Sequence, residues 1–481
     1  MNAPLRRVAI SVLVLFTLLI VNVNYIQVVR SDELRNNSSN TRVLAAEYDR
    51  ERGAIVVAGN AVAESVPTDG RLKYLRQYPQ GELYAAVTGY HSLIYNNSQL
   101  ERAENDVLSG SDGRLALRRL ADLFTGRDPA GGDVVLTLDP AVQEAAMAGL
   151  EGVTGAVVAL DPSSGAILGM ASTPSYDPTR LSSHDPAAIR AYWDELGAAE
   201  RDPRLNRAIG DNYPPGSLFK VVVSAAALED GYTPDTVIPA PDELPLPNSS
   251  RVIPNFNGSS CSSTGEQTLN DALTISCNTA FAQLGMDLGE DRVREMAEAF
   301  GMDGEKFDIP LRVQGSSIGD VEDDAALAQT SIGQRDVRMT PLQAAMIAAT
   351  VANDGHQMRP YLVDQVQAPD LTVIDSTEPE EWRNPVSVDV ANQLTEMMKS
   401  VVANGSGRAA RIPGVEVAGK TGTAQVSEDV ADHTWFMGFA PADDPKIAVA
   451  VFVANGGGTG GERSAPIARQ VMQAYLDGLG N

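Results

Sequence analysis

The chain has 481 residues, and its 37 Lys and Arg against 63 Asp and Glu give a formal net charge of −26 at pH 7. Because neutralising phosphates needs clustered Lys and Arg, this balance argues against nucleic acid as a partner, and 43% hydrophobic residues exclude disorder as the dominant state. Two Cys and four scattered His cannot build a disulfide scaffold or a four-Cys zinc site, so we expect no metal and no cofactor.

The acidic charge is unevenly distributed along the chain. Residues 1–30 contain Arg6, Arg7 and Arg30 but no acid, so this segment carries +3 and the remainder −29. Between Arg7 and Arg30 the chain is mostly apolar, and as a helix it would span roughly 30 Å, enough to cross a bilayer. We predict an uncleaved transmembrane anchor within residues 1–30, with the N-terminus in the cytoplasm because two arginines precede the span. A cleaved signal peptide is the alternative, but residues 21–25 offer no small-x-small site.

Residues 31–152 contain no pattern that points to chemistry, and we predict that they form a non-catalytic N-terminal domain. The expected elements are strands at 54–57 and 134–138, a loop or linker at 125–132, and a helix from Pro140 to Leu150. Asp139 would be the N-cap of that helix, with Pro140 in its first turn.

The remaining residues, 153–481, predict a sheet built from both ends of the segment. The expected strands are 155–160, 166–171, 415–426, 434–439 and 447–454, followed by a closing helix at 466–479. Residues from about 200 to 400 are mostly helical in pattern. An antiparallel sheet with helices inserted between its strands is an α+β arrangement.

One helix in this central region is unusual because it is apolar on every side. Residues 217–228 contain a single cation, Lys220, and an all-apolar helix belongs in the interior. A buried ammonium is costly and the helix dipole disfavours a positive charge in the first turn, so both effects would lower the pKa of Lys220. Ser217 lies one turn earlier on the same face, and a serine beside a deprotonatable lysine is a nucleophile with its base. The alternative is an N-cap serine and a lysine that reaches solvent.

Two further short motifs accompany this pair. Ser-Cys-Asn at 276–278 lies in a helical pattern, and Lys-Thr-Gly-Thr at 420–423 lies on a strand. Ser-x-x-Lys, Ser-Asp-Asn and Lys-Thr-Gly are the motifs of class A β-lactamases and penicillin-binding proteins. The chain has this set in the same order, with Cys at the middle of the second motif. It therefore resembles a class B penicillin-binding protein, a monofunctional D,D-transpeptidase, of the actinobacterial penicillin-binding protein A type.

The resemblance extends beyond the three motifs to most of the chain. Further matching segments are Arg52–Ile55, Ala159–Gly165, Pro174–Asp177, Arg207–Ala208, Pro214–Lys220, Met339–Leu342 and Trp435–Pro441. The resemblance implies a transpeptidase fold like that of serine β-lactamases, with an antiparallel sheet flanked by helices and an all-helical subdomain. Residues 31–152 would then be a domain of the pedestal or dimerisation type. One segment departs from the family, because many relatives have a second glycine at the position of Arg335.

The resemblance also implies catalytic roles for individual residues. Ser217 would attack the carbonyl of the penultimate D-Ala in a stem peptide and release the terminal D-Ala, while Lys220 would take its proton. Ser276 would pass a proton to the leaving amine, and Lys420 would tune this relay electrostatically. Asn278 would hold Lys220 and the substrate amide.

Substrate binding is implied in the same way for the strand motif. The backbone N–H groups of Ser217 and Thr423 would form the oxyanion hole, and the hydroxyls of Thr421 and Thr423 would bind the substrate carboxylate. Gly422 would leave room for the substrate backbone along the strand edge. An amine from a neighbouring stem peptide would resolve the acyl-enzyme, and β-lactams would trap Ser217. The expected partner in the membrane is a glycan polymerase of the SEDS type.

The two cysteines lie close in sequence, and one is inside a motif. Cys261 and Cys277 would close a loop of about 17 residues, worth roughly 3 kcal/mol in the chain-entropy model. Because Cys277 is the middle residue of Ser-Cys-Asn, a bridge would stiffen that motif. We expect the disulfide to form, since the compartment outside the membrane is oxidising.

Other functions compete with this interpretation. Gly414–Thr421 fits the Walker A pattern of a P-loop NTPase, but its interior alternates like a strand. Gly315–Gly319 fits the nucleophile elbow of α/β-hydrolases, but acids at 320–324 would begin its helix. Within the resembled superfamily, a D,D-carboxypeptidase, a β-lactamase and a β-lactam sensor are alternatives, as is a non-catalytic wall-binding scaffold. A β-lactamase needs neither anchor nor N-terminal domain, and a scaffold would tolerate loss of motif residues.

Overall fold

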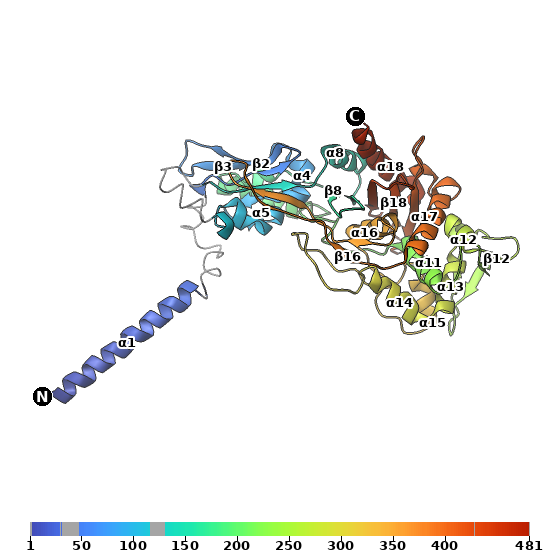
Figure 1. Ribbon diagram of the computed structural model, residues 1–481, viewed down its shortest axis with the longest axis horizontal. Coiled ribbons are helices and arrows are strands. Elements are labelled where there is room, and N and C mark those ends of the chain that lie inside the picture. The colour runs from blue at the N-terminus through green and yellow to red at the C-terminus, as the bar shows by residue number, and fades with distance from the viewer. Residues whose placement is uncertain (1, 29, 31–47, 116–129, 428, 481) are drawn as a thin grey trace.

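The computed structural model describes residues 2–28, 30, 48–115, 130–427 and 429–480. Helix α1 (Asn2–Val28) points away from the rest of the chain (Figure 1), and its described side chains are exposed. From Arg6 to Val28 it is long and apolar enough to cross a membrane, as expected for an anchor. Residues 31–47 and 125–129, predicted to belong to the N-terminal domain and to a linker, lie outside the described residues.

A six-stranded sheet forms the part of the molecule from which α1 extends (Figure 1). Its order is β15-β14-β6-β1-β2-β3, and only β1 and β6 pair in parallel among its described strands. The strands are β1 (Ile55–Val57), β2 (Asn60–Pro67), β3 (Tyr74–Gln77), β6 (Asp133–Leu136), β14 (Val363–Gln367) and β15 (Val373–Ser376). Near them lie α4 (Gly81–Thr88), α5 (Gln99–Ala103), α6 (Asn105–Leu108), η1 (Gly113–Leu115) and the hairpin of β4 (His91–Ser92) and β5 (Asn96–Asn97).

Strands β14 and β15 come from far along the chain, and sequence patterns did not place them in this sheet. Val366 of β14 pairs with Val134 of β6, more than 200 residues earlier. Burial along β14 does not alternate, so the strand carries no period-two signal. The chain therefore returns to the N-terminal sheet before it completes the second sheet.

The second sheet has five antiparallel strands in the order β17-β18-β19-β7-β8. They are β7 (Gly155–Leu160), β8 (Ile167–Thr173), β17 (Ala418–Ala424), β18 (His433–Ala440) and β19 (Ile447–Val453). The strand expected at 415–426 is shorter at both ends, and the others shift by at most two residues. The sheet is built from both ends of its segment, as predicted for an α+β fold.

Helices cover both faces of this sheet. Helices α8 (Pro140–Gly149) and α18 (Gly460–Leu479) share one apolar cluster with it, and α16 (Pro341–Ala352) packs on the other face. Asp139 caps α8 as predicted, with Oδ1 accepting from Val142 N at 3.0 Å. Helix α18 begins six residues before the predicted start, because Thr459 and Glu462 form a capping box and Pro466 lies inside the helix.

The segment between β8 and β17 is rich in helices, as expected, but it also contains short strand pairs. Its longer elements are α10 (Pro186–Gly197), α11 (Lys220–Glu229), α12 (Leu269–Ile275), α13 (Asn278–Leu288), α14 (Glu290–Ala299), α15 (Asp324–Thr330) and α17 (Val388–Ala403). The short ones are α9 (Pro178–Leu181), η2 (Gly216–Leu218), β9 (Val237–Pro239), β10 (Glu243–Pro245), β11 (Val252–Pro254), η3 (Phe256–Gly258), β12 (Glu266–Thr268), β13 (Gln357–Met358), β16 (Glu381–Arg383) and η4 (Arg408–Ala410). Helix α11 is buried almost all round and contacts α13, α14 and α17.

A buried charge cluster lies at the centre of the N-terminal sheet region. The Glu101 carboxylate on α5 accepts from Arg52 Nε and Arg76 Nε, both at 2.6 Å, and from the Tyr78 hydroxyl at 3.1 Å. Burial alone would raise the pKa of Glu101, but the two guanidinium groups outweigh it and hold that pKa at about 2. The cluster joins the segment before β1, strand β3 and helix α5 by buried charges.

The loop that departs from the pattern implied by the resemblance has a left-handed residue at Arg335. Arg335 adopts φ +60°, and its side chain forms ion pairs with Glu322 and Asp336. Gly333 has φ +70°, and its carbonyl accepts from Gly216 N at 2.9 Å. The loop therefore has the backbone conformation that glycine favours, although arginine occupies the position.

We predict that Glu101→Gln lowers the free energy of unfolding by about 3 kcal/mol, because two buried guanidinium groups lose their counter-charge. The folded pKa lies below the ordinary 4.5, so the stabilisation is complete above pH 4.5 and is lost as pH falls through about 2. Denaturant unfolding at several pH values measures both effects. Glu195→Gln is the control, because its pair with Arg180 is exposed and worth under about 1 kcal/mol. An equal decrease in the free energy of unfolding in Glu101→Gln and Glu195→Gln would contradict the prediction.

We predict that Arg335→Gly leaves the unfolding free energy within about 1 kcal/mol of the parent, since relief of positive-φ strain offsets loss of exposed ion pairs. Arg335→Val should have an unfolding free energy about 1 to 2 kcal/mol lower than that of Arg335→Gly, because a β-branched side chain is disfavoured at this φ. Thermal unfolding of both variants tests the difference. Arg251→Val is the control at an exposed residue without positive φ, and the same loss there would refute backbone strain as the cause.

Candidate active site

The predicted nucleophile lies on a tight turn rather than inside an α-helix. Ser217 is half-buried in η2, and α11 begins only at Lys220. Gly216 has φ +53°, and a Cβ on it would overlap the carbonyl oxygen of Thr423. Trp435 Nε1 donates to Pro214 O at 2.9 Å on the other side of the turn. The turn is thus fixed by close backbone contact with the strand that carries Thr423.

Lys220 is fully buried in the first turn of α11. Its Nζ donates to Ser276 O and Asn278 Oδ1, both at 2.8 Å, and lies 3.3 Å from Ser276 Oγ. Burial, and then the nearby charge of Lys420, hold the pKa of Lys220 well below its usual value. A lysine that reaches solvent, the alternative from the sequence, is excluded by its complete burial.

The Ser-Cys-Asn motif joins two helices, whereas the sequence predicted it within one. Helix α12 ends at Ile275, Ser276 adopts φ +64°, and α13 begins at Asn278. The left-handed residue turns the chain between the helices. As a result the Ser276 hydroxyl, its carbonyl and the Asn278 side chain all face Lys220.

Lys420 reaches the same hydroxyl from the sheet. It is fully buried on β17, and its Nζ donates to Ser276 Oγ and to Thr421 O, both at 2.9 Å. Burial lowers the pKa of Lys420 to about 7. Among the hydrogen bonds and ion pairs of the described residues, neither Lys220 nor Lys420 has a carboxylate partner. The two amines can therefore exchange a proton through Ser276 without a fixed counter-charge.

The rest of the strand motif has contacts that sequence reasoning only partly anticipated. Thr421 Oγ1 lies 2.6 Å from Ser406 Oγ, and Thr423 Oγ1 accepts from Gly460 N at 3.3 Å. Ser406 was not among the predicted site residues, because its only sequence signal is a turn between two glycines. A Cβ on Gly422 would lie 2.6 Å from Pro215 O. The glycine therefore permits contact with the turn of Ser217, and its role in leaving room for the substrate stays a prediction.

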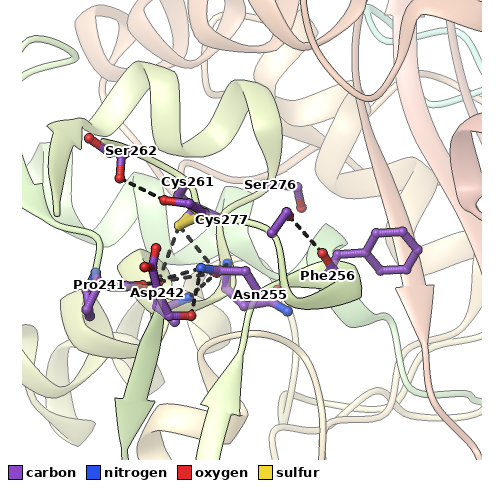
Figure 2. The surroundings of a disulfide bond; sticks show 12 residues. Pro241, Asp242, Asn255, Phe256, Cys261, Ser262, Ser276 and Cys277 are labelled. Carbon is purple, nitrogen blue, oxygen red and sulfur yellow. Dashed lines mark hydrogen bonds between the residues drawn. A yellow bond between two sulfur atoms is a disulfide. The ribbon is translucent and has the colours of Figure 1, made fainter. Parts of the chain in front are cut away.

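A disulfide joins Cys261 to Cys277, with their Cα atoms 5.9 Å apart. Figure 2 shows the bridge directly beside Ser276, between α13 and the loop that follows η3. The covalent bond therefore fixes the middle of the Ser-Cys-Asn motif to a loop that is otherwise exposed.

The two rival motifs do not form the structures that they need. Residues 418–424 of the Walker-like run are strand β17, and no helix follows Thr421 as a P-loop requires. In the elbow-like run, Ser317 pairs with Arg338 in an isolated bridge, and the next helix starts at Asp324. A strand-turn-helix elbow is therefore absent from this described segment.

The comparisons with known proteins agree with this geometry. A model of the penicillin-binding protein transpeptidase domain matches residues 155–473, and one of the penicillin-binding protein A dimerisation domain matches residues 52–134. The chain is 49% identical over 488 residues to peptidoglycan D,D-transpeptidase PbpA of Mycolicibacterium smegmatis, covering 99% of both chains. It is 47% identical over 490 residues to PbpA of Mycobacterium tuberculosis, covering 99% of this chain and 100% of that one.

A solved structure of a penicillin-binding protein is also similar to this chain. The ceftriaxone acyl-enzyme complex of penicillin-binding protein A from M. tuberculosis matches with a TM-score of 0.88 at 47% identity. The match covers 90% of this chain and 100% of that chain. The chain therefore belongs to the penicillin-binding protein transpeptidase family, and its fold is the transpeptidase fold that its motifs implied.

Proposed function

We propose that this protein is a peptidoglycan D,D-transpeptidase that cross-links stem peptides through an acyl-enzyme on Ser217. The observation that carries the proposal is the convergence of two buried lysines on one serine hydroxyl beside the turn of Ser217. The membership of the family and the similarity to relatives named D,D-transpeptidase support it. The arrangement needs no metal and no cofactor.

Acylation begins at Ser217. Its Oγ forms a bond to the carbonyl carbon of the penultimate D-Ala, and neutral Lys220 accepts the hydroxyl proton. The lowered pKa of Lys220 supports this role, because an ordinary lysine would be charged at neutral pH. When the bond to the terminal D-Ala breaks, a proton passes from Lys220 through Ser276 Oγ to the leaving amine. Lys420 donates to Ser276 Oγ and so completes the chain of hydrogen bonds.

Binding and transition-state stabilisation fall to the turn and the strand. The N–H groups of Ser217 and Thr423 would form the oxyanion hole, which the contact between Gly216 and Thr423 supports. The hydroxyls of Thr421 and Thr423 would bind the substrate carboxylate. An amine of a neighbouring stem peptide then attacks the acyl carbon and gives up a proton through Ser276 to neutral Lys220, which returns that proton to the Ser217 oxygen as the acyl–oxygen bond breaks. β-Lactams would acylate the Ser217 oxygen, which the acyl-enzyme complexes of penicillin-binding protein A from M. tuberculosis with ceftriaxone and penicillin G support.

We propose a single-pass arrangement in the membrane. Residues 1–30 would be the cytoplasmic tip and anchor, residues 31–152 the N-terminal non-catalytic domain, and residues 153–481 the transpeptidase domain. Arg6 and Arg7 before the span support a cytoplasmic N-terminus. A SEDS-type glycan polymerase in the membrane would supply the strands to be cross-linked.

The full chain, solubilised in detergent and incubated with penicillin, should gain the mass of one covalent adduct that persists for hours. Ser217→Ala should gain none, because no oxygen is left to acylate. Ser224→Ala is the matched control, since its hydroxyl lies buried on α11, the helix that follows the turn of Ser217, without a hydrogen-bond partner. Absence of an adduct, or an adduct on Ser217→Ala, would overturn the mechanism. Rapid loss of the adduct would instead favour a β-lactamase.

The same preparation separates transfer from hydrolysis. A stem peptide ending in D-Ala-D-Ala, supplied with an acceptor amine, should yield the cross-linked product together with free D-Ala. Release of D-Ala without cross-linking would support a D,D-carboxypeptidase. No release by a chain that does react with penicillin would support a sensor or scaffold.

The rate of acylation should rise with pH through the pKa of Lys220, because only the neutral amine accepts a proton. Lys420→Met should move this acid limb to higher pH, because loss of the neighbouring positive charge raises the pKa of Lys220. Stopped-flow acylation from pH 5 to 9 measures the shift. Lys399→Met, on the outer side of α17 with two exposed carboxylate partners, should leave the limb in place. If the acid limb of the pH–rate profile moves to lower pH in Lys420→Met, the assignment of Lys220 as the base is contradicted.

A further inference from the structure

Helix α13 starts inside the active site, and its own N-cap residue does not cap it. Cys277 is the N-cap, and its sulfur, which forms the disulfide, accepts no hydrogen bond from a backbone N–H of the first turn. The first backbone N–H groups of a helix have no partners within the helix, and they need partners from elsewhere when they are buried. These groups belong to Asn278 and Thr279, directly after Cys277.

A side chain from a distant loop supplies the missing cap. Asn255 is 4% exposed, and its Oδ1 accepts from Asn278 N and from Thr279 N, both at 3.1 Å. Its Nδ2 donates to Pro241 O and Asp242 O, both at 3.3 Å. Figure 2 shows the carboxamide between the loop at Pro241 and the start of α13. A flipped amide would place an NH₂ group against N–H groups, so these contacts define one orientation.

The residue before Asn255 fixes the other end of the motif asparagine. Asn278 Nδ2 donates to Pro254 O at 3.2 Å, which leaves Asn278 Oδ1 directed at Lys220 Nζ at 2.8 Å. The backbone and the side chain of Asn278 are therefore both held by residues 254 and 255. Any movement of this segment changes the position of the acceptors around Lys220.

We propose that Asn255 is a positioning residue for acyl transfer, which caps α13 from outside the helix and so holds Asn278 and Ser276 against Lys220. The inference rests on the proposed function, since it takes Lys220 and Ser276 as the proton relay. Asn255 itself contacts no reacting atom. Its side chain and the disulfide are two separate ties between the same loop and the motif, one by hydrogen bonds and one covalent. The side chain of Asn255 and the disulfide together hold Ser276 in a left-handed conformation, which is unfavourable for a residue other than glycine.

Substitution of Asn255 should act on the chemical step more than on binding. In Asn255→Leu, which has a similar volume but no acceptor, we expect the acylation rate constant for penicillin to fall about tenfold, as expected for loss of an N-cap. The dissociation constant of the noncovalent complex should change less than about threefold, because Thr421 and Thr423 on β17 do not contact Asn255. Asn255→Asp keeps the acceptor oxygens and should recover most of the rate. If Asn255→Leu does not fold, Asn255→Ser, whose hydroxyl is too short to reach α13, replaces it.

The matched control is Asn206→Leu. Asn206 is equally buried, and its amide bonds the backbone of Ala86 and Ala208 at 2.8 and 3.1 Å, away from the motifs. It should lose thermal stability as Asn255→Leu does, but keep the parental acylation rate. Equal rates in Asn255→Leu and Asn206→Leu, or an Asn255→Asp variant as slow as Asn255→Leu, would overturn the inference. A parent chain that penicillin does not acylate at Ser217 would overturn the proposed function instead.

Discussion

The Ser276 hydroxyl lies within 3.3 Å of Lys220 Nζ and 2.9 Å of Lys420 Nζ, and the rest of the structure depends on this contact. Two fully buried ammonium groups at such a distance from one hydroxyl cannot both keep their protons, because repulsion adds to the cost of burial. One proton can therefore move between the amines, with a hydroxyl as the bridge. The fold has to hold three segments, α11, the start of α13 and β17, close enough for that exchange.

Backbone contact at glycine provides much of this closeness. The turn of Ser217 touches β17 where Gly216 meets Thr423 and where Gly422 meets Pro215, and it touches the loop of Arg335 where Gly333 meets Gly216. At each place a side chain would push the segments apart. Proximity of the nucleophile to the strand is thus set by main-chain packing, which resists small displacements better than contacts between flexible side chains. Because the main chain is held in this way, the side chains of Ser276 and Asn278 keep fixed positions for their hydrogen bonds with the two lysines.

The sequence was sufficient for the parts of the site that depend on local pattern. Lys220 could be identified because it is the only cation on an apolar helix, and the strands of the second sheet follow apolar runs. Ser276 was misplaced within a helix, because its left-handed conformation is set by ties to a distant loop. Asn255 and Ser406 were not identified, since each is a single polar residue in a loop of ordinary composition. Strands β14 and β15 joined an unexpected sheet because their pairing is non-local and their burial does not alternate.

A comparison of the Glu101 cluster with the Lys220–Lys420 pair shows why neither lysine has a carboxylate beside it among the described residues. At Glu101, two guanidinium groups enclose a carboxylate, and this neutralisation lowers its pKa to about 2, so that no proton moves at physiological pH. A carboxylate placed between Lys220 and Lys420 would have the corresponding effect, stabilising both ammonium forms and removing the base. The net charge of −26 favours protonated amines at long range, yet burial at short range outweighs it at both lysines. Around Glu101 the cost of burial is compensated by two opposite charges. Around Lys220, Ser276 and Lys420 the cost is left uncompensated, so a proton can move between the two amines.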